Sequence, residues 1–276
     1  MDSICRKTIE LAYREDVGKG DITTMATVPR NYRGKAIIVA KSEGVLSGVE
    51  AVRYAYGLVS SRVKVAFHVK AGKAFRIGTK IATITGPSQA LIKGERLALN
   101  LLSHLCGVAT ATSRYVRETS GTRAKILDTR KTTPGLRALE KQAVKDGGGL
   151  NHRMGLYDMI LIKDNHIEAA GGIIQALEKV KKARLKVEIE VANNDQLKEA
   201  LQYWPDVIML DNYSVRDASR AVKLIRAVRP KIKIEYSGGV TLKKIRAIAR
   251  TGVDYISVGA LTHSVMASDL SMRYIK

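Results

Sequence analysis

The sequence predicts an α/β protein whose second part is an incomplete TIM-like β/α barrel and whose first part is an α+β domain with a mostly antiparallel sheet. Three observations support this prediction. In the second half of the chain, short and almost wholly apolar strand-like runs alternate with helical segments, as in parallel sheets covered on both faces. Polar residues gather directly after those runs. The strand-like runs of the first half show no such alternation with helices.

Length and composition are those of a globular protein with one large domain or two unequal ones. Hydrophobic residues make up 45% and charged residues 26% of the 276 positions. No apolar run approaches the ~20 residues of a membrane-spanning helix, and the N-terminus lacks the apolar core of a signal peptide. The two cysteines, Cys5 and Cys106, are too few for a disulfide scaffold and lack metal-type spacing. We therefore expect a cytoplasmic enzyme that binds no membrane.

The net charge of +21 is the most unusual property of the composition. An excess of this size often marks a protein that binds nucleic acid or an anionic surface. The cations are, however, spread along the chain without a basic tail, and aromatic residues make up only 5%, which is sparse for a base-stacking surface. The alternative is a cationic surface around a site for polyanionic small molecules. We favour this alternative and expect no nucleic acid partner, although the charge keeps the other interpretation open.

In the first half, helices and strands follow one another irregularly. Residues 4–13 and 50–59 have helical character. Residues 35–41, 63–69 and 80–85 are β-rich and bounded by Gly, Pro or Ser. Such strands, separated by turns or a single helix, favour an antiparallel sheet over half of a barrel.

A long helical pattern over residues 94–119 joins the two halves. Its apolar residues recur at steps of three and four and predict one broad buried stripe, formed by Leu97, Leu101, Leu105 and Val108. Arg96 lies in the first turn, where the helix dipole disfavours a cation. A solvated surface arginine and a functional one both stay open at this point.

In the second half, six strand-like runs recur, with a seventh short strand near Leu150 as a candidate. The runs span residues 124–127, 159–162, 187–191, 207–210, 232–236 and 255–258. Helical segments between them span residues 172–183, 195–202, 215–228 and 241–250. This pattern favours a β/α barrel over a doubly wound sheet.

Polar residues lie within or directly after every one of these strands. They are Asp128 to Lys131, Lys163 to His166, Glu188 and Glu190, Asp211 and Asn212, Ser237 to Gly239, and Gly259 and Ala260 with His263 beyond. The C-terminal ends of barrel strands meet at one rim, which is where barrels carry their active sites.

The stretch from Asp128 to Arg153, DTRKTTPGLRALEKQAVKDGGGLNHR, carries two basic clusters around a helix-like segment. Pro134 and Gly135 keep the first cluster on a loop, and three glycines let the backbone approach closely at the second. A solvated basic surface is the bland interpretation. Because the first cluster lies at a strand end and a matching one follows, we expect a strongly anionic ligand.

Two further features indicate phosphate and metal chemistry. Ser237-Gly238-Gly239 and Gly259 follow the last two strands, where many barrels bind phosphate through glycine N–H groups and the start of the next helix. Two ordinary turns are the alternative. Glu190 and Asp211 either pair with nearby cations or hold Mg²⁺, which prefers oxygen ligands. The histidines lack the spacing of zinc ligands.

Together these motifs resemble the quinolinate phosphoribosyltransferase family, also called nicotinate-nucleotide pyrophosphorylases (carboxylating). DTRKTTPG, GGGLNHR, IKDNH, LDN, SGG and VGALTHS occur in the order of the family, and GERLALN resembles its inter-domain helix. The resemblance covers essentially the whole chain. It implies an N-terminal α/β sandwich domain over residues 1–108 and a seven-stranded incomplete barrel with the active site over residues 109–276. The C-terminal tail is a candidate for packing back on the first domain.

The resemblance also implies the reaction and the residues that perform it. Phosphoribose would pass from PRPP to quinolinate in the presence of Mg²⁺, giving nicotinate mononucleotide, pyrophosphate and CO₂ in de novo NAD biosynthesis. The implied quinolinate-binding residues are Arg96, Thr129, Arg130, His152, Arg153 and Lys163. The implied PRPP-binding residues are Lys131, Glu190, Asp211, Ser237, Gly238, Gly239, Gly259, Ala260 and His263. The expected catalytic residues are Lys131, Lys163, Glu190 and Asp211, of which Glu190 and Asp211 are the expected metal ligands.

The sequence departs from the family pattern at one residue, and the family also implies a partner subunit. Tyr236, before the SGG motif, stands where a smaller residue is expected and predicts a difference in packing only. The family further implies a homodimer, or a higher oligomer, in which Arg96 reaches the barrel of the neighbouring subunit.

The nearest alternative is a phosphoribosyltransferase of the same architecture that acts on nicotinate or another acid. Such an enzyme needs the phosphate loops but only one set of carboxylate-binding cations. Quinolinate carries two carboxylates, and guanidinium groups bind carboxylates with two parallel hydrogen bonds. Arg130 and Arg153, with His152 and Lys163, therefore favour the diacid.

Overall fold

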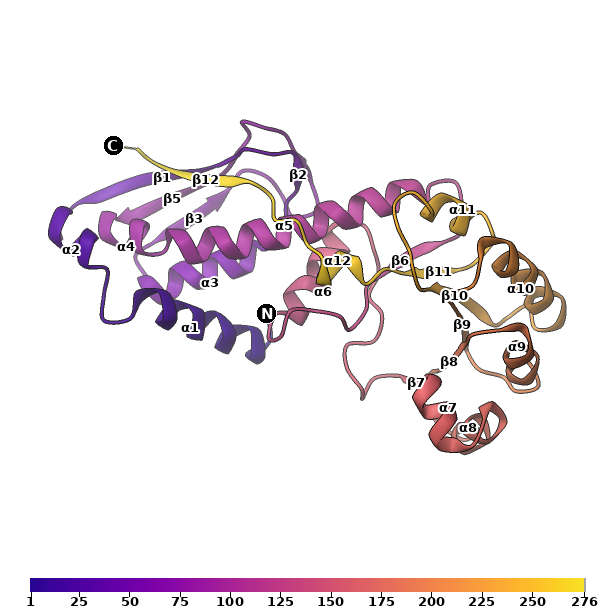
Figure 1. Cartoon of the computed structure of the whole chain (residues 1–276). Helices are drawn as coiled ribbons and strands as arrows, with labels where there is room; N and C mark the ends of the chain where they lie inside the picture. The colour runs from indigo at the N-terminus through magenta and orange to yellow at the C-terminus, as the bar shows by residue number, and fades with distance from the viewer. Residues whose placement is uncertain (276) are drawn as a thin grey trace. The chain divides into compact units, whose positions relative to one another are not determined.

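The computed structural model describes residues 1–275 and divides into two compact units (Figure 1). Unit 1 comprises Met1–Ser113, Lys131–Gly148 and the chain from Ala260 onward, and unit 2 comprises Arg114–Arg130 and Gly149–Gly259. Each unit is therefore assembled from segments that are far apart in the sequence. The domain boundary after residue 108 stays a prediction.

Unit 1 is built on a four-stranded antiparallel sheet with the order β12-β1-β5-β3. The strands are β1 (Arg33–Ala40), β3 (Lys64–Phe67), β5 (Lys80–Pro87) and β12 (Leu270–Ile275). The short strands β2 (Gly44–Val45) and β4 (Ala74–Phe75) form a separate pair. The predicted antiparallel character of this sheet is confirmed, and β12, from the far end of the chain, pairs with β1 from Lys35↔Ile275 to Ala40↔Leu270.

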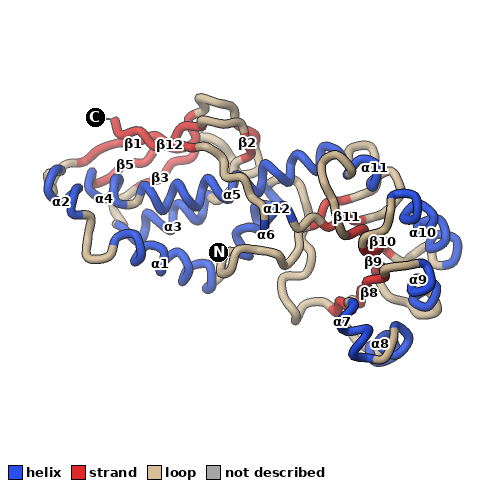
Figure 2. The backbone as a smooth tube through the Cα atoms, viewed as in Figure 1, coloured by secondary structure: helices blue, strands red, loops and turns tan. Residues whose placement is uncertain are grey.

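Helices α3 (Val49–Val59) and α4 (Ser88–Lys93) pack on one face of this sheet (Figure 2). The other helices of unit 1 are α1 (Ser3–Val17), α2 (Ile22–Thr27), α6 (Arg137–Asp146) and α12 (Ala260–His263). Burial alternates along β1, so that Ala36 and Ile38 pack into a core with Tyr56 from α3 and Leu91 from α4. This alternation is what a sheet with one covered face requires.

Helix α5 (Glu95–Glu118) begins in unit 1 and ends in unit 2. The predicted stripe is buried throughout, as Leu97, Leu101, Leu105 and Val108 are at most 8% exposed. Arg96 is exposed in the first turn.

Unit 2 contains a six-stranded parallel sheet with the order β6-β11-β10-β9-β8-β7. The strands are β6 (Lys125–Leu127), β7 (Ile160–Ile162), β8 (Val187–Val191), β9 (Val207–Asp211), β10 (Lys233–Ser237) and β11 (Tyr255–Ser257). The helices are α7 (Asp164–Ala170), α8 (Ile173–Val180), α9 (Asn194–Ala200), α10 (Val215–Val228) and α11 (Ile245–Ala249). The predicted seventh strand is a single parallel bridge between Leu150 and Leu127. The prediction of an incomplete barrel is confirmed.

The strand register arranges the barrel interior in layers. Glu190 pairs with Met209, Met209 with Glu235, and Asp211 with Ser237. Paired residues of parallel strands point to the same face, and residues two apart on one strand share that face. Asp211 and Ser237 are the last residues of β9 and β10 and thus lie at the rim, and Glu190 is one residue from the end of β8. Glu188 lies two residues before Glu190, and Glu235 two residues before Ser237, in the part of the interior that barrels usually fill with apolar side chains.

None of the helices within residues 1–275 combines the length and the apolar character that crossing a bilayer requires.

Candidate active site at the barrel rim

Asp128, at the end of β6, holds the second basic cluster in place. Its carboxylate is fully buried and accepts hydrogen bonds from the backbone N–H of His152, at 2.9 Å, and from the side-chain amide of Asn151. The backbone N–H of Asp128 donates to Leu150 at 3.2 Å. These hydrogen bonds hold the NHR cluster beside the end of β6, where the DTRK cluster begins. The sequence predicts that the two clusters share one anion-binding site.

His152 and Arg153 lie in the interior of unit 2. The Nδ1 atom of His152 accepts the backbone N–H of Arg153 at 2.7 Å, while Nε2 lies 3.1 Å from a Glu188 oxygen and 3.7 Å from a Glu235 oxygen. The Arg153 guanidinium is 9% exposed and donates to the Met159 carbonyl at 3.2 Å.

Arg153 is held beside a second cation. Burial lowers the pKa of its guanidinium, and repulsion from Arg130 lowers it further, whereas Glu188 and Asp158 act in the opposite direction. Two guanidinium groups close enough to repel each other are stabilised by an anion placed between them. The pair suits a ligand with carboxylates, which each guanidinium can bind bidentately.

Lys163 and Glu190, from neighbouring strands β7 and β8, form an ion pair at 2.8 Å. Lys163 lies directly before α7, and its backbone N–H donates to Nδ1 of His166 at 3.0 Å. On the next strand, Asp211 accepts the side-chain amide of Asn212 at 2.6 Å. Each of these two contacts uses one oxygen of a half-buried carboxylate.

Left-handed backbone occurs at three residues in this part of the rim: Asn212 after β9, and Gly238 and Gly239 after β10. Gly238 has φ 92°, and a Cβ atom there would lie 2.1 Å from Oδ1 of Asn212 and 2.9 Å from its backbone N. Asn212 has φ 55°, and within residues 1–275 it alone among non-glycine residues has positive φ. Its backbone N–H donates to the Ser237 carbonyl at 2.9 Å. Backbone strain of this kind commonly accompanies a binding site.

The helices after the two glycine loops differ in position. Helix α11 begins only at Ile245, several residues after the glycines. A phosphate at the β10 loop would therefore contact the glycine backbone and not the start of the helix. Helix α12 begins at Ala260, directly after Gly259. Tyr236 packs as predicted, being 5% exposed with its hydroxyl donating to the Tyr213 carbonyl at 2.6 Å.

Four predicted site residues lie in unit 1: Arg96, Lys131, Ala260 and His263. The Lys131 side chain is exposed, and its carbonyl accepts the Thr262 hydroxyl at 2.7 Å. The Thr133 N–H donates to Glu140 at 3.1 Å, and this buried carboxylate also contacts Nε2 of His104 at 2.7 Å. The TRKT loop is thus anchored to α5, α6 and α12 within unit 1. The remaining predicted residues are in unit 2.

Three buried carboxylates support these loops, namely Glu140, Glu188 and Glu235. Sequence reasoning named Glu188 among the polar residues of the strands without giving it a role, and it missed Glu140 and Glu235. All three are at most 1% exposed. Sequence spacing also gave no sign that a histidine would join carboxylates, yet the fold brings His152, Glu188 and Glu235 within 4.8 Å of one another. The signal in the sequence was an acid placed inside an otherwise apolar strand, at Glu188 and Glu235.

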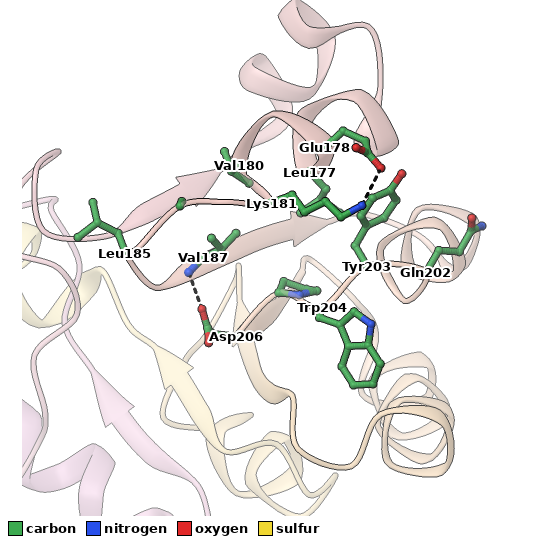
Figure 3. Close-up of a pocket in the computed structure, with 12 residues that line it drawn as sticks. Leu177, Glu178, Val180, Lys181, Leu185, Val187, Gln202, Tyr203, Trp204 and Asp206 are labelled. Carbon is green, nitrogen blue, oxygen red and sulfur yellow. Dashed lines mark hydrogen bonds and ion pairs between the residues drawn. The ribbon is translucent and has the colours of Figure 1, made fainter.

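A separate hollow of about 560 Å³ lies where β8 and β9 begin, at the opposite ends of the strands from the rim (Figure 3). Leu177, Lys181 and Trp204 line it, and at its base Asp206 accepts the Val187 N–H at 2.7 Å. It contains none of the predicted site residues. Barrel enzymes carry their chemistry at the C-terminal ends of the strands, so the rim is the candidate active site.

Comparison with known proteins gives one consistent result. The family model for the quinolinate phosphoribosyl transferase C-terminal domain matches residues 108–273, and the model for the N-terminal domain matches residues 21–106. A Bacillus subtilis (strain 168) protein, named as a probable nicotinate-nucleotide pyrophosphorylase (carboxylating), is 44% identical over 97% of this chain and 92% of its own. The nicotinate-nucleotide pyrophosphorylase (carboxylating) of Mycobacterium leprae is 42% identical over 97% and 96%. The solved nicotinate-nucleotide pyrophosphorylase of Francisella tularensis superposes with a TM-score of 0.92 at 35% identity, over 99% and 96%.

Proposed function

The chain belongs to the quinolinate phosphoribosyltransferase family, and we propose that it uses the barrel rim of unit 2 to join quinolinate to phosphoribose. The enzyme transfers phosphoribose from PRPP to quinolinate with loss of CO₂, forming nicotinate mononucleotide and pyrophosphate for NAD biosynthesis. The observation that carries the location is the pair of hydrogen bonds by which Asp128 holds Asn151 and His152 beside the end of β6, in a rim that also carries Lys163.

Quinolinate fits this part of the rim by charge and shape. Its two carboxylates would relieve the repulsion between Arg130 and Arg153, since each guanidinium gains an anionic partner. Thr129, Lys163 and the His152 backbone segment border the same region through β6, β7 and the Asp128 hydrogen bonds. A monoacid such as nicotinate would pair with fewer of these cations, which costs binding free energy.

PRPP would occupy the neighbouring strand ends. A phosphate could approach the β10 loop closely at Gly239, because a Cβ atom there would meet nothing within 4 Å, whereas the Asn212 side chain lies against Gly238. Gly259 and Ala260 offer a second backbone surface of the same kind. Lys131 would neutralise part of the leaving pyrophosphate by charge alone.

The donor set at Glu190 and Asp211 fits Mg²⁺. Both residues offer carboxylate oxygens on the same face of adjacent strands, and one oxygen of each accepts a hydrogen bond, from Lys163 at Glu190 and from Asn212 at Asp211. Magnesium uses one or two protein carboxylates and keeps its other ligands as water or phosphate. When bound, the ion would supply charge neutralisation for the pyrophosphate. Lys163 would then hold Glu190 in place.

The protein's own residues need only bind, orient and exclude water. Displacement at C1 of the ribose builds positive charge on the sugar, and the rim carboxylates suit that charge. Once ribosylated, the pyridine nitrogen is cationic and accepts the electron pair left by the departing carboxylate, so the loss of CO₂ needs no protein nucleophile. Positioning therefore supplies most of the catalysis in this proposal.

The assembly in the proposal is a cytoplasmic homodimer with shared active sites. Arg96 lies in unit 1 and is exposed, and a cation in the first turn of a helix lacks the favourable dipole that it would have at the other end. Its position is better explained by an anionic ligand than by helix stability. We place that ligand in the barrel of a second copy.

A direct assay tests the proposal. The purified chain with PRPP and Mg²⁺ should form nicotinate mononucleotide and release one CO₂ for each quinolinate consumed, while nicotinate under the same conditions stays essentially unused. Equal turnover of the two acids would instead favour a monoacid phosphoribosyltransferase. Omitting Mg²⁺ and adding EDTA should abolish the reaction, and activity that survives chelation would contradict the metal assignment.

A further inference from the structure

Three side chains meet in the barrel interior one layer below the rim: His152, Glu188 and Glu235. The Nε2 atom of His152 lies 3.1 Å from Glu188 and 3.7 Å from Glu235, and the two carboxylates are each 1% exposed. The Ser257 hydroxyl donates to the other oxygen of Glu235. Two acids at this depth are costly unless their charges are compensated, so the cluster calls for a function.

The hydrogen bond at the other ring nitrogen fixes what His152 can do. Nδ1 accepts the backbone N–H of Arg153 at 2.7 Å and must therefore carry a lone pair. A neutral imidazole has one N–H, and an imidazolium has two. With Nδ1 as acceptor, Nε2 must bear the hydrogen and donate it to the carboxylates. A metal ion at this cluster would need a lone pair on Nε2, so the geometry favours hydrogen bonds over metal ligation.

The two carboxylates also need a donor between them. Oε1 of Glu188 is fully buried and, within residues 1–275, meets no N–H or O–H donor. Burial raises the pKa of Glu235 well above its ordinary value, and repulsion from Glu188 raises it further, along with a hydrogen bond to Glu188. A protonated Glu235 supplies one O–H, which satisfies Glu188 and removes the repulsion.

We propose that Glu188 and Glu235 are positioning residues of the quinolinate site, and that a hydrogen bond from Glu235 to Glu188 holds the imidazole of His152 so that its Nδ1 orients the Arg153 backbone. This inference rests on the proposed function. The chain of contacts runs from Glu235 to Glu188, to Nε2 of His152, and through Nδ1 to the amide of Arg153. Both ring nitrogens of His152 then serve the protein, and the guanidinium of Arg153 serves the substrate.

The chain of contacts explains why apolar side chains at Glu188 and Glu235 could not hold His152 in place. An apolar pair at Glu188 and Glu235 would leave Nε2–H of His152 buried without an acceptor, which is unfavourable. The imidazole would turn away, and the Arg153 amide would lose its partner. Because guanidinium recognition of a carboxylate depends on orientation, a small displacement of Arg153 weakens binding of one substrate and spares the other.

The test compares Glu235→Gln with Glu235→Leu. Glutamine keeps an N–H donor toward Glu188 and should leave the KM for quinolinate within about twofold of wild type. Leucine removes the donor and should raise that KM at least about tenfold, with the KM for PRPP within about twofold. Ser257→Ala removes only the hydroxyl that holds Glu235, and it should shift the quinolinate KM in the same direction by a smaller factor. This milder variant keeps the test decisive if the leucine variant fails to fold.

Asp254→Asn provides the matched control. Asp254 is also buried, at 6% exposure, but lies before β11 and binds Arg226 at 2.5 Å and the Ile234 N–H at 2.9 Å. Asp254→Asn should lower the Tm, and it should not raise the KM for quinolinate relative to the KM for PRPP. Equal losses for both substrates in Glu235→Leu, or failure of Gln to restore the quinolinate KM, would overturn the positioning role. So would one tightly bound transition metal per chain that is lost in Glu235→Leu. A wild-type chain inactive on quinolinate would instead refute the proposed function.

Discussion

Arg153 has surroundings unlike those of the many surface cations of this chain. Its guanidinium is nearly buried, its pKa is lowered by burial and by Arg130, and its backbone N–H is held by His152. Repulsion between the Arg153 and Arg130 guanidinium groups is unfavourable, and binding of a dianionic ligand would offset it. The sequence identifies such residues because DTRK and NHR are unusual clusters. It singles out Glu188 only as a polar residue within a strand and does not single out Glu235, since an acid within a strand suggests a solvent-facing position unless the closure of the barrel is known.

At the residue scale, substitutions of different residues should raise the KM for quinolinate and the KM for PRPP. Arg153→Ala should raise the KM for quinolinate at least about tenfold, because a desolvated carboxylate loses its bidentate partner. Asp211→Ala should instead raise the KM for PRPP and the Mg²⁺ concentration required for half-maximal activity. Arg184→Ala, at an exposed cation before β8, is the neutral control. Both site variants raising the KM of the same substrate alone would refute the division of the rim.

Stability should depend on pH through Glu235. Its pKa is raised in the folded protein, mainly by burial, so the unfolded chain releases this proton at a lower pH than the folded one. The stabilising contribution of the bound proton is complete below the unfolded pKa and declines as pH rises toward the folded pKa. Glu235→Gln carries no such proton. Denaturant titrations should show that the stability of the variant relative to wild type increases as pH rises above about 4.5. A constant difference in the free energy of unfolding from pH 4 to pH 8 would contradict the raised pKa.

At the scale of elements, the strand ends decide the site. The sequence predicts all six barrel strands, because continuous apolar runs followed by polar residues carry a strong signal. Loop geometry is not predictable in the same way. The left-handed Asn212 and its contact with Gly238 depend on the neighbouring strand, which no local pattern encodes. Helix α11 (Ile245–Ala249) likewise starts later and is shorter than the predicted helix over residues 241–250.

The β10 loop offers a prediction of its own. Gly238→Ala places a Cβ against Asn212 in a backbone region that L side chains rarely adopt, so the loop must shift. The KM for PRPP should rise at least about tenfold and the Tm should fall, since a strained alanine costs about 1 kcal/mol or more. Gly78→Ala is the matched control, because its φ of 82° is similar and its Cβ meets nothing within 4 Å. It should lower the Tm alone. An unchanged KM for PRPP in Gly238→Ala would remove the loop from the phosphate site.

At the scale of the whole molecule, the two units interleave along the chain. Sequence patterns separate an irregular first half from a regular second half, and the structure follows that division in its sheets. The patterns do not reveal that residues 131–148 belong with the first half, because membership of a unit is decided by tertiary packing. For the chain from Ala260 onward, only the family resemblance made the C-terminal tail a candidate for packing on the first domain. The subunit arrangement is likewise beyond a single chain and stays a prediction.

Subunit exchange tests the shared site. Arg96→Ala and Arg130→Ala homodimers should each be nearly inactive, because every active site lacks one arginine. After exchange, about half of the dimers combine one chain of each kind and contain one intact site, so activity should approach about a quarter of wild type. Mass spectrometry of differently tagged chains verifies the exchange. Full exchange without recovered activity would show that Arg96 serves its own chain or no site at all.

Strand β12 occupies the edge of the unit 1 sheet, beside β1, and it follows the entire barrel in the chain. During translation, unit 2 is complete once Gly259 has been made, while β1 still waits for its partner. The part of the protein that is synthesised first is therefore finished last. In the interval, the edge of β1 displays unpaired N–H and C=O groups, a template on which nascent chains can pair with one another. Slow decoding of the codons between Gly259 and Leu270 would prolong that exposure, so synonymous changes there should alter the soluble yield without altering the enzyme.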